Sequence, residues 1–301
     1  MDVRALGSGG LVSSVIGLGT KALTGAYGPV SRREADRTIR YALDMGITMF
    51  DTADFYSGGE TERLLGEALS GRRDAALVAT CGGLRFNTAG KPVAVDGDPA
   101  YLARACDASL RRLRTDYIDL FYLARTDPQI PVQDSVGKLA ELVAAGKIRY
   151  LGLCDITADQ LRRAQEIHPI SVLAVEYSLL QRSAEAGPLA LASELGMGVV
   201  ACSPLCRGLL TGGGSFVASP RQQRALRVIE AEAAELDVGI ERLALAWLLA
   251  WRDDIVPVPS TRNPAHIEMS VSAPCIRLSF DTRARLAALF PTDGDYEPAG
   301  P

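Results

Sequence analysis

From about residue 15 onward, short apolar runs alternate with longer amphipathic stretches along the chain. The apolar runs have the length of strands, whereas the stretches between them repeat apolar positions every three or four residues, as helices do. Nearly continuous apolar strands are typical of a parallel sheet that is covered by helices. We predict strands at residues 15–19, 47–51, 75–80, 117–123, 148–153, 172–176, 197–201 and 255–258. We predict helices at 31–45, 60–69, 99–113, 132–145, 158–167, 184–195, 221–236, 240–251, 263–272 and 281–289.

Strand and helix alternate eight times without a linker-like break, which predicts a single (β/α)8 barrel domain spanning residues 1–301. Residues 6–12 contain turn-forming glycines and predict a small hairpin that caps one end of the barrel. Ser31 and Glu34 have the spacing of a capping box at the start of the first helix. A doubly wound open sheet is the alternative, but Gly17-Leu-Gly19 is not continued into the glycine pattern of dinucleotide-binding sheets.

Polar residues follow the predicted strands at the point where each strand ends. Asp51 lies at the end of strand 47–51, and Tyr56 follows in the next loop. In parallel barrels the carboxyl ends of the strands form the active site, so this pair predicts site residues. The alternative is an aspartate that caps a helix and an aromatic residue of a loop. The other strand-end residues are Thr20, Lys21, Cys81, Ala124, Arg125, Cys154, Asp155, Tyr177, Cys202, Ser203, Ser260, Thr261 and Arg262.

The composition narrows the class of protein. The 301 residues carry 32 basic and 36 acidic side chains, and their net charge of −4 includes no basic stripe, so we expect no nucleic-acid partner. No apolar run is long enough for a membrane span, and the first residues do not resemble a signal peptide. We therefore expect a cytoplasmic protein whose six scattered cysteines are free thiols. The oligomeric state cannot be predicted from the sequence.

Seven sequence blocks, in order, resemble the aldo-keto reductase family, and they span nearly the whole chain. They are FDTADFY at 50–56, LGEAL at 65–69, DYIDLFYL at 116–123, AGKIRYLGL at 145–153, EYSLL at 176–180, SPLCRGLLTG at 203–212 and PSTR at 259–262. The resemblance implies a (β/α)8 barrel and NADPH-dependent carbonyl reduction. In this family a tyrosine hydroxyl donates the proton, helped by a lysine paired with an aspartate and by a histidine near the carbonyl.

The resemblance is incomplete at the catalytic residues. Asp51 and Tyr56 match the family's aspartate and tyrosine. Cys81 stands at the lysine position and Ala124 at the histidine position. The phenol of tyrosine normally titrates near pKa ~10, and a neighbouring ammonium makes it a usable acid near neutrality. This chain has lost that ammonium from its usual position.

The cofactor positions are partly retained. The Ser-Asn pair that holds the nicotinamide carboxamide corresponds to Cys154 and Asp155, the helping glutamine to Ala174, and the adenine-reading pair to Met269 and Ser270. The resemblance still implies a cofactor-binding role at several positions. It implies that Tyr177 stacks on the nicotinamide ring and that the 203–212 loop wraps the pyrophosphate. It also implies that the 260–262 segment binds a 2′-phosphate. These cofactor positions are Thr20, Tyr177, Ser203, Leu205, Arg207, Ser260, Thr261 and Arg262.

The loss of catalytic helpers beside retained Asp51 and Tyr56 predicts an enzyme with redox-silent acid–base chemistry: dehydration, isomerisation or cyclisation of a small carbonyl- or hydroxyl-bearing metabolite. That hypothesis needs no cofactor. The alternatives are an NADPH-dependent carbonyl reductase with a modified active site, which would bind NADP(H), and a non-catalytic ligand-binding barrel. We expect residues 84–97, 125–131 and the C-terminal tail to select the substrate.

Two further candidates could replace the missing groups. Lys21 follows strand 15–19, and its ammonium could reach Asp51 or Tyr56; the alternative is a lysine that points to solvent. Cys81 could act as a catalytic thiolate if a cation lowered its pKa. A thiolate metal site and plain apolar packing are the other interpretations of the strand-end cysteines, and we expect no metal.

Overall fold

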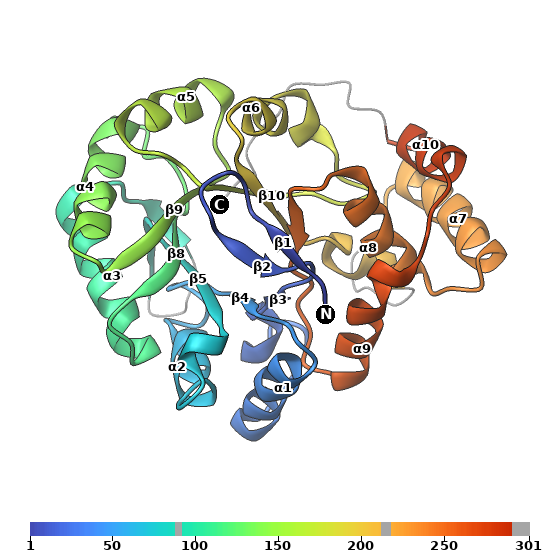
Figure 1. Ribbon diagram of the computed structural model, residues 1–301, viewed down its shortest axis with the longest axis horizontal. Helices are drawn as coiled ribbons and strands as arrows, with labels where there is room; N and C mark the ends of the chain where they lie inside the picture. The colour runs from blue at the N-terminus through green and yellow to red at the C-terminus, as the bar shows by residue number, and fades with distance from the viewer. Residues whose placement is uncertain (88–91, 212–217, 291–301) are drawn as a thin grey trace.

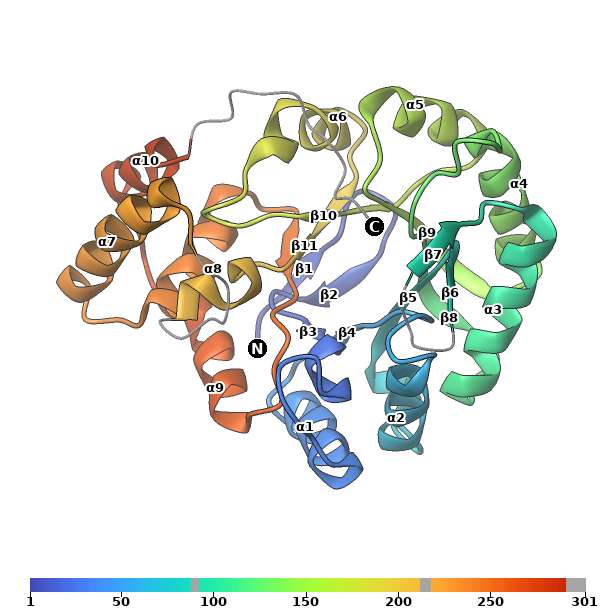
Figure 2. The same ribbon diagram turned by 180° about the vertical axis from the view of Figure 1, so that it is seen from behind.

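The computed structural model describes residues 1–87, 92–211 and 218–290 and has the predicted barrel. Eight parallel strands form one sheet, which Figures 1 and 2 show ringed by helices. In spatial order they are β3 (Leu18–Gly19), β4 (Met49–Asp51), β5 (Leu77–Gly82), β8 (Ile118–Leu123), β9 (Ile148–Cys154), β10 (Val172–Glu176), β11 (Gly198–Cys202) and β12 (Ile255–Pro257). The barrel closes where Gly19 bridges to Ser260 and the amide of Gly17 donates to the carbonyl of Pro257.

The helices lie close to their predicted positions. They are α1 (Arg32–Asp44), α2 (Glu60–Ala68), α3 (Pro99–Leu113), α4 (Val132–Ala144), α5 (Ala158–Ile167), α6 (Pro188–Glu194), α7 (Pro220–Glu235), α8 (Ile240–Trp251), α9 (Pro264–Ser272) and α10 (Phe280–Ala288). The capping box at Ser31 and Glu34 is confirmed, since each side chain accepts from the other's main-chain amide. The helix predicted at 184–195 is divided at Gly187 into a short 3-10 helix, Ser183–Ala186, and α6, because Pro188 lacks the amide that would continue the first helix.

Two hairpins lie at opposite ends of the barrel. The predicted N-terminal hairpin pairs β1 (Val3–Ala5) with β2 (Val12–Ser14), and Gly7 in its turn bridges to Met197 at the amino end of β11. It covers the barrel end that faces the viewer in Figure 1. The sequence did not predict the second hairpin, β6 (Leu84–Phe86) with β7 (Pro92–Val95), which follows β5 and appears on the opposite face in Figure 2.

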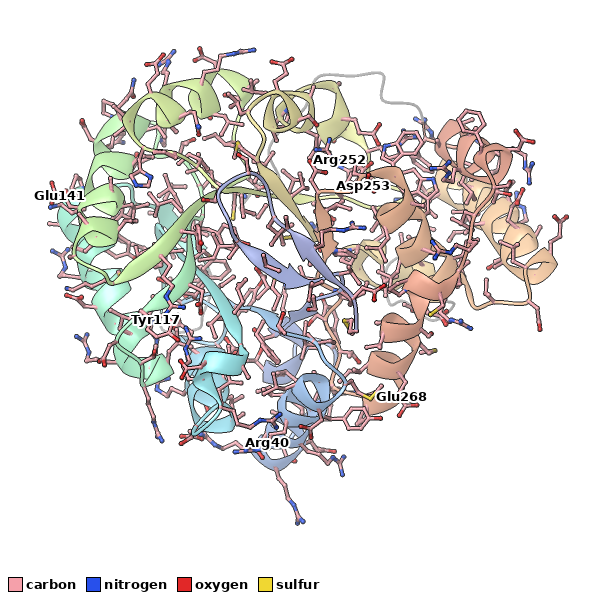
Figure 3. The ribbon with its side chains drawn as sticks, viewed as in Figure 1. Arg40, Tyr117, Glu141, Arg252, Asp253 and Glu268 are labelled. Atoms are coloured by element: carbon pink, nitrogen blue, oxygen red, sulfur yellow. The ribbon has the colours of Figure 1, made fainter. Side chains whose placement is uncertain are left out.

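Alternate residues of each strand enter two separate cores. On β4, Met49 packs inside the barrel whereas Phe50 packs between the strands and the outer helices. The interior is filled by apolar side chains up to the level of Cys81, Tyr122 and Ala174. Charged side chains lie mostly on the outside of the helices, as Arg40, Glu141 and Glu268 do in Figure 3. In the parts of the chain that the structure describes, no helix is long and apolar enough to cross a bilayer.

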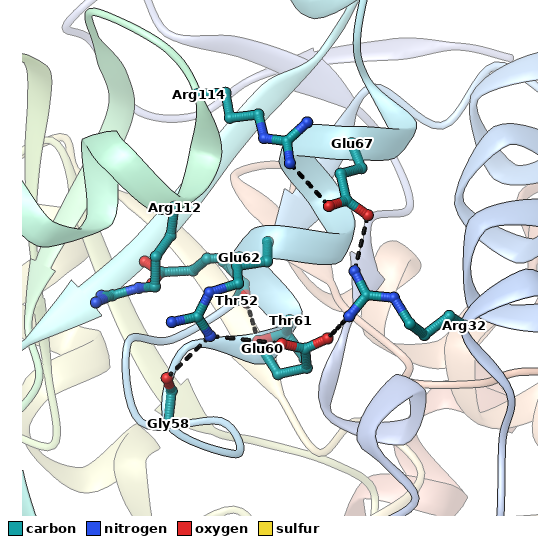
Figure 4. Close-up of polar contacts among 10 residues, drawn as sticks. Arg32, Thr52, Gly58, Glu60, Thr61, Glu62, Glu67, Arg112 and Arg114 are labelled. Carbon is teal, nitrogen blue, oxygen red and sulfur yellow. Dashed lines mark hydrogen bonds and ion pairs between the residues drawn. The ribbon is translucent and has the colours of Figure 1, made fainter.

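The segment between β4 and α2 is tied down by polar contacts (Figure 4). Thr52 Oγ1 donates to Thr61 Oγ1 over 2.8 Å, which fastens the start of this segment to α2. Glu67 of α2 accepts from Arg32 of α1 at 2.8 Å and from Arg114 after α3 at 2.9 Å. These contacts hold α2 to both neighbouring helices. They also fix the point at which the loop that carries Tyr56 joins α2.

Candidate active site

Asp51 ends β4 with its carboxyl group at the mouth of the barrel. Its main-chain carbonyl accepts from the amide of Thr20 at 2.9 Å and from Thr20 Oγ1 at 3.1 Å. The residue is 9% exposed, and its carboxylate has no hydrogen bond to any described residue. Thr20 is completely buried, lines neither of the cavities described below and holds the main chain of Asp51, so the structure does not favour its predicted cofactor-binding role.

Tyr56 reaches the same mouth from the loop that follows β4. This loop turns back through Ser57, Gly58 and Gly59, all with positive φ, before α2 begins at Glu60. The Tyr56 ring packs edge-on against Phe55 with centroids 5.1 Å apart, and Phe55 stacks on Phe86 of the unpredicted hairpin at 4.8 Å. The structure therefore brings Asp51 and Tyr56 together beside an aromatic wall.

Two cavities meet at this pair. The first, about 480 Å³, has the aromatic wall on one side and strand-end residues below. The second, about 730 Å³, extends from the mouth towards α9. Residues that line both cavities are Lys21, Ala26, Asp51, Tyr56, Cys202, Ser203 and Arg207. A long ligand could therefore occupy the second cavity and present one end beside Asp51 and Tyr56.

Burial controls the protonation of both groups. It raises the pKa of the Asp51 carboxyl from its ordinary 3.8 to about 7. Burial also raises the pKa of the Tyr56 phenol well above 10, and the Asp51 carboxyl and nearby thiols raise it further. Of the two, the carboxyl is therefore the stronger acid. This order of acid strength fits the presence of Cys81 and Ala124 at the positions where the family has a lysine and a histidine.

Lys21 does not fill the place of the missing ammonium. Its side chain lines both cavities but is exposed, and burial is the cause of the raised pKa of Asp51. The neighbours that most affect the pKa of Tyr56 are Asp51 and thiols, each of which raises it. The structure thus favours the alternative of a lysine at the solvent-facing rim over a catalytic partner of Tyr56.

The cysteines line the floor as neutral thiols. Cys81, Cys154 and Cys202 all border the first cavity, and burial raises the pKa of each well above 9. The predicted catalytic role of Cys81 as a thiolate is not supported, because a buried thiol without a neighbouring cation stays protonated. Within the described ranges, no group of three or more side chains is arranged to hold a metal ion, and all six cysteines are unpaired with one another.

Two ion pairs lie at the rim of the first cavity. Arg125 contacts Asp155 at 3.4 Å, and Arg207 contacts Glu176 at 2.8 Å. Asp155 has a φ of +44°, so its main chain turns sharply directly after β9. These four side chains line the first cavity together with Cys154 and Ala174, two of the positions where the carboxamide-holding residues are replaced.

The second cavity is lined by six of the residues to which the sequence analysis assigns a cofactor-binding role. Ser203, Leu205 and Arg207 line it from the loop after β11, and Ser260, Thr261 and Arg262 line it from the segment after β12. The guanidinium of Arg262 lies over Gly28 and donates to the carbonyl of Pro29. Asn263 and His266 also line this cavity, and Asn263 caps the N-terminus of α9.

Tyr177 lines neither cavity, so the structure does not favour its predicted stacking on a nicotinamide ring. Its side chain is fully buried, and its hydroxyl donates to Glu185 Oε1 at 2.6 Å. The ring lies 6.2 Å from that of Trp247 in the outer core. The reason is the two-residue period of a strand: Glu176 lines the cavity, so the next side chain points the other way.

Sequence reasoning missed Tyr122 as a residue of the cavity floor. Its ring lies inside the barrel on β8, and it is 2% exposed. Its hydroxyl is buried and has no hydrogen-bond partner in the structure. The strand period offered a signal, because Tyr122 shares its face with Ala124 at the barrel mouth.

Comparison with known proteins identifies the family. The sequence profile of the aldo/keto reductase family matches residues 15–290. The chain belongs to the aldo/keto reductase family. It is therefore related to oxidoreductases, and a protein described as probable aldo-keto reductase 1 of Glycine max is 37% identical to it, covering 91% of this chain and 84% of that protein.

Solved aldo-keto reductase structures agree with this assignment. The holo form of an aldo-keto reductase from Bacillus halodurans superposes with a TM-score of 0.86 at 29% identity, covering 99% of this chain and 98% of that one. An aldo/keto reductase from Klebsiella pneumoniae, solved with NADP and acetate, gives a TM-score of 0.80 at 26% identity, with coverage of 98% and 99%.

These relatives correct the main functional prediction. A redox-silent lyase or isomerase was expected from the missing catalytic groups, but the aldo/keto reductase profile and the full-length likeness to reductases contradict that interpretation. The second possibility raised by the sequence, a reductase with a modified active site, agrees with them. The missing groups therefore call for an explanation within reductase chemistry.

Proposed function

We propose that this chain is an NADP(H)-dependent carbonyl reductase in which the carboxyl group of Asp51 supplies the proton. The observation that carries the proposal is the junction of the two cavities at Asp51 and Tyr56. A dinucleotide in the larger cavity would present its nicotinamide at that junction, and a small carbonyl compound would enter through the smaller cavity. The related reductase from Klebsiella pneumoniae was solved with NADP, which supports this choice of cofactor.

The residues of the larger cavity fit the phosphate-bearing end of such a cofactor. Arg262 is a cation at the start of α9, where unpaired helix amides favour an anion. Ser260 and Thr261 add hydroxyl groups, and Arg207 adds a second guanidinium nearer the junction. Because Arg262 now donates to the carbonyl of Pro29, binding of a 2′-phosphate would exchange that neutral acceptor for a charged one.

The bound cofactor would supply hydride to the carbonyl carbon, and the protein must supply a proton to the carbonyl oxygen. Asp51, with a pKa raised to about 7, is protonated in a useful fraction of molecules at neutral pH. When it gives up this proton, its O–H bond breaks, an O–H bond forms on the substrate, and a carboxylate remains. The higher pKa of Tyr56 suits it to stay protonated and orient the carbonyl oxygen by a hydrogen bond.

The first cavity favours a small, uncharged substrate with an aromatic or other flat apolar part. Phe55 and Phe86 provide a stacked wall, whereas the floor is made of neutral thiols and a phenol. The charged groups at the rim, Arg125 with Asp155 and Arg207 with Glu176, are already paired with one another.

The unpaired thiols agree with the cytoplasmic location predicted from the sequence.

Calorimetric titration with NADPH and NADH tests the cofactor assignment. NADPH should bind more tightly than NADH, and Arg262→Ala should weaken NADPH binding by about tenfold or more while leaving NADH nearly unchanged, because only NADPH carries the 2′-phosphate. Arg227→Ala, an exposed arginine on α7, is the matched control. Equal affinity of the wild-type protein for both dinucleotides, or no binding at all, would contradict the assignment.

Turnover with a panel of aromatic and aliphatic aldehydes and ketones tests the reaction. We expect oxidation of NADPH that depends on the carbonyl compound, with the corresponding alcohol as product. Asp51→Asn should reduce the rate by about 10²-fold or more, since an amide has no proton of suitable acidity to donate. A protein that binds NADPH tightly but reduces no member of the panel would refute the proposed reaction while leaving the cofactor site intact.

A further inference from the structure

Tyr122 has a feature that packing cannot explain. Its ring fills the barrel interior, but its hydroxyl is buried without a hydrogen-bond partner. Leaving such a group unpaired destabilises the fold, and a phenylalanine would fill the same space without that cost. A buried hydroxyl that is kept unpaired at the edge of a cavity therefore indicates a partner that is present only in another state of the site.

The neighbouring strand is shaped to hold the ring. Tyr122 pairs with Gly152 of β9, and a Cβ atom at Gly152 would lie 2.4 Å from Tyr122 Cδ1 and 2.7 Å from Cε1. Any side chain at position 152 would thus displace the phenol. On its other side Tyr122 pairs with Cys81 of β5, the strand next to the one that carries Asp51.

Asp51 is the group that can become the missing partner. Tyr122 and Asp51 both line the first cavity, from strands β8 and β4 that lie on either side of β5. Burial raises the pKa of Tyr122 well above its usual value, and the Asp51 carboxyl raises it further. Among the described residues, neither the Tyr122 hydroxyl nor the Asp51 carboxyl has a side-chain hydrogen bond. A carboxylate accepts a stronger hydrogen bond than a neutral carboxyl group does.

We propose that Tyr122 is a positioning residue that donates its hydroxyl hydrogen to the Asp51 carboxylate after Asp51 has given its proton to the substrate. The inference rests on the proposed function for the identity of the proton's recipient. Tyr122 would thereby stabilise the negative charge left on Asp51, in a chain that has Cys81 and no cation at the family's lysine position. Because the phenol is a neutral donor, it does not force Asp51 to ionise before the proton is transferred to the substrate.

The surroundings of Asp51 leave Tyr122 and Tyr56 as its two phenol donors. The titratable and charged groups that line the cavities with Asp51 are Lys21, Tyr27, Tyr56, Cys81, Tyr122, Arg125, Cys154, Asp155, Glu176, Cys202, Arg207, Arg262 and His266. Tyr27 is 43% exposed and lines the second cavity alone, which leaves the other two phenols. The three buried thiols are weak donors, and the four side chains of the rim ion pairs engage one another. Tyr56 lines both cavities and is assigned to the substrate carbonyl, whereas Tyr122 lines the first cavity alone, so Tyr122 is the phenol that remains for Asp51.

The test is a titration of Asp51 in the protein without added ligand, followed by ¹³C NMR of labelled aspartate carboxyls and assigned with Asp51→Asn. Loss of a hydrogen bond to the charged form raises a carboxyl pKa, so Tyr122→Phe should move the titration about one pH unit upward. Tyr150→Phe is the control: this tyrosine lies on β9 near the opposite end of the barrel, packed against the same interior core, and should leave the titration unchanged.

A second variant keeps the test valid if Tyr122→Phe does not fold. Incorporation of 3-fluorotyrosine at position 122 makes the phenol a stronger donor with almost the same shape, and it should lower the pKa of Asp51. An unchanged pKa of Asp51 in Tyr122→Phe, or in the fluorinated protein, overturns the proposal. Because no cofactor or substrate is present, this result is independent of whether the protein reduces carbonyls.

Kinetics provide the second measurement. Tyr122→Phe should lower kcat about tenfold with little change in KM, and the fall of kcat at high pH should move upward together with the carboxyl titration. Loss of affinity without a shift of the pH profile would indicate a packing role for Tyr122 and would overturn the proposal.

Discussion

Replacement of Asp51 by Asn should make the stability of the protein less sensitive to pH. The carboxyl is buried in the fold, which raises its pKa from 3.8 to about 7, whereas in the unfolded chain it titrates at its ordinary value. Below about pH 4 both states are protonated, and the group has no effect on the pH dependence of folding. As the pH rises from about 4 to 7, the unfolded chain loses this proton and the folded protein keeps it, so the wild-type protein loses stability relative to the variant. Above about pH 7 both states are ionised and the difference is constant.

The expected size follows from the pKa difference. Roughly three pH units at about 1.4 kcal/mol each give ~4 kcal/mol, which should accumulate in favour of Asp51→Asn between about pH 4 and pH 8. Urea unfolding followed by the fluorescence of Trp247 and Trp251 measures it, because Trp247 of α8 is fully buried and the Trp251 ring stacks on it at 5.2 Å. Glu230→Gln, an exposed carboxylate on α7, is the control and should show no such trend. A constant difference between wild type and Asp51→Asn across this range would show that Asp51 is already ionised in the fold, and the proposed proton donor would be refuted.

Three further predictions concern the same region. Cys81→Lys should place an ammonium beside Asp51 and lower the carboxyl pKa by at least one pH unit in an NMR titration, because an opposite charge favours the ionised form; no movement would mean that position 81 does not face the carboxyl. Glu62→Ala should cost about 3–5 kcal/mol in urea unfolding, because it leaves Arg112 with a half-buried unpaired charge, and a loss below about 1 kcal/mol would contradict the importance of this pair. Iodoacetamide near neutral pH should label exposed Cys275 at least ten times faster than Cys81, as peptide mapping would record; equal rates would contradict a protonated, buried thiol.

The order and length of most elements could be predicted because they depend on local patterns. The helices Pro99–Leu113, Ala158–Ile167 and Ile240–Trp251 begin and end where apolar periodicity and the flanking residues place them. The hairpin of Leu84–Phe86 and Pro92–Val95 could not be predicted in this way. Its strands are three and four residues long, too short to establish a period, and their register shifts between Arg85 and Phe86. The C-terminal tail, residues 291–301, was expected to select substrate and lies outside the described residues.

The candidate site was only partly predictable, because strand-end position does not fix side-chain direction. Asp51 and Tyr56 lie at the cavity junction as expected, whereas Tyr177 points into the outer core and Thr20 supports the main chain. Tyr122 was missed because its importance depends on an unpaired hydroxyl and on the space that Gly152 leaves, neither of which is visible before the strands are paired. The replacements at positions 81 and 124 led to the prediction of a different reaction, whereas the relatives support a reductase. The change of proton donor is our proposal for how a reductase could work without those groups.

The most direct test of the account is the pH dependence of a single turnover of NADPH with a carbonyl substrate, followed by the loss of reduced nicotinamide in stopped flow. If Asp51 supplies the proton, the rate should be constant at low pH, fall about tenfold per pH unit above about pH 7, and be nearly lost in Asp51→Asn at every pH. A rate that is independent of pH through this range, or an Asp51→Asn variant as fast as wild type, would contradict it.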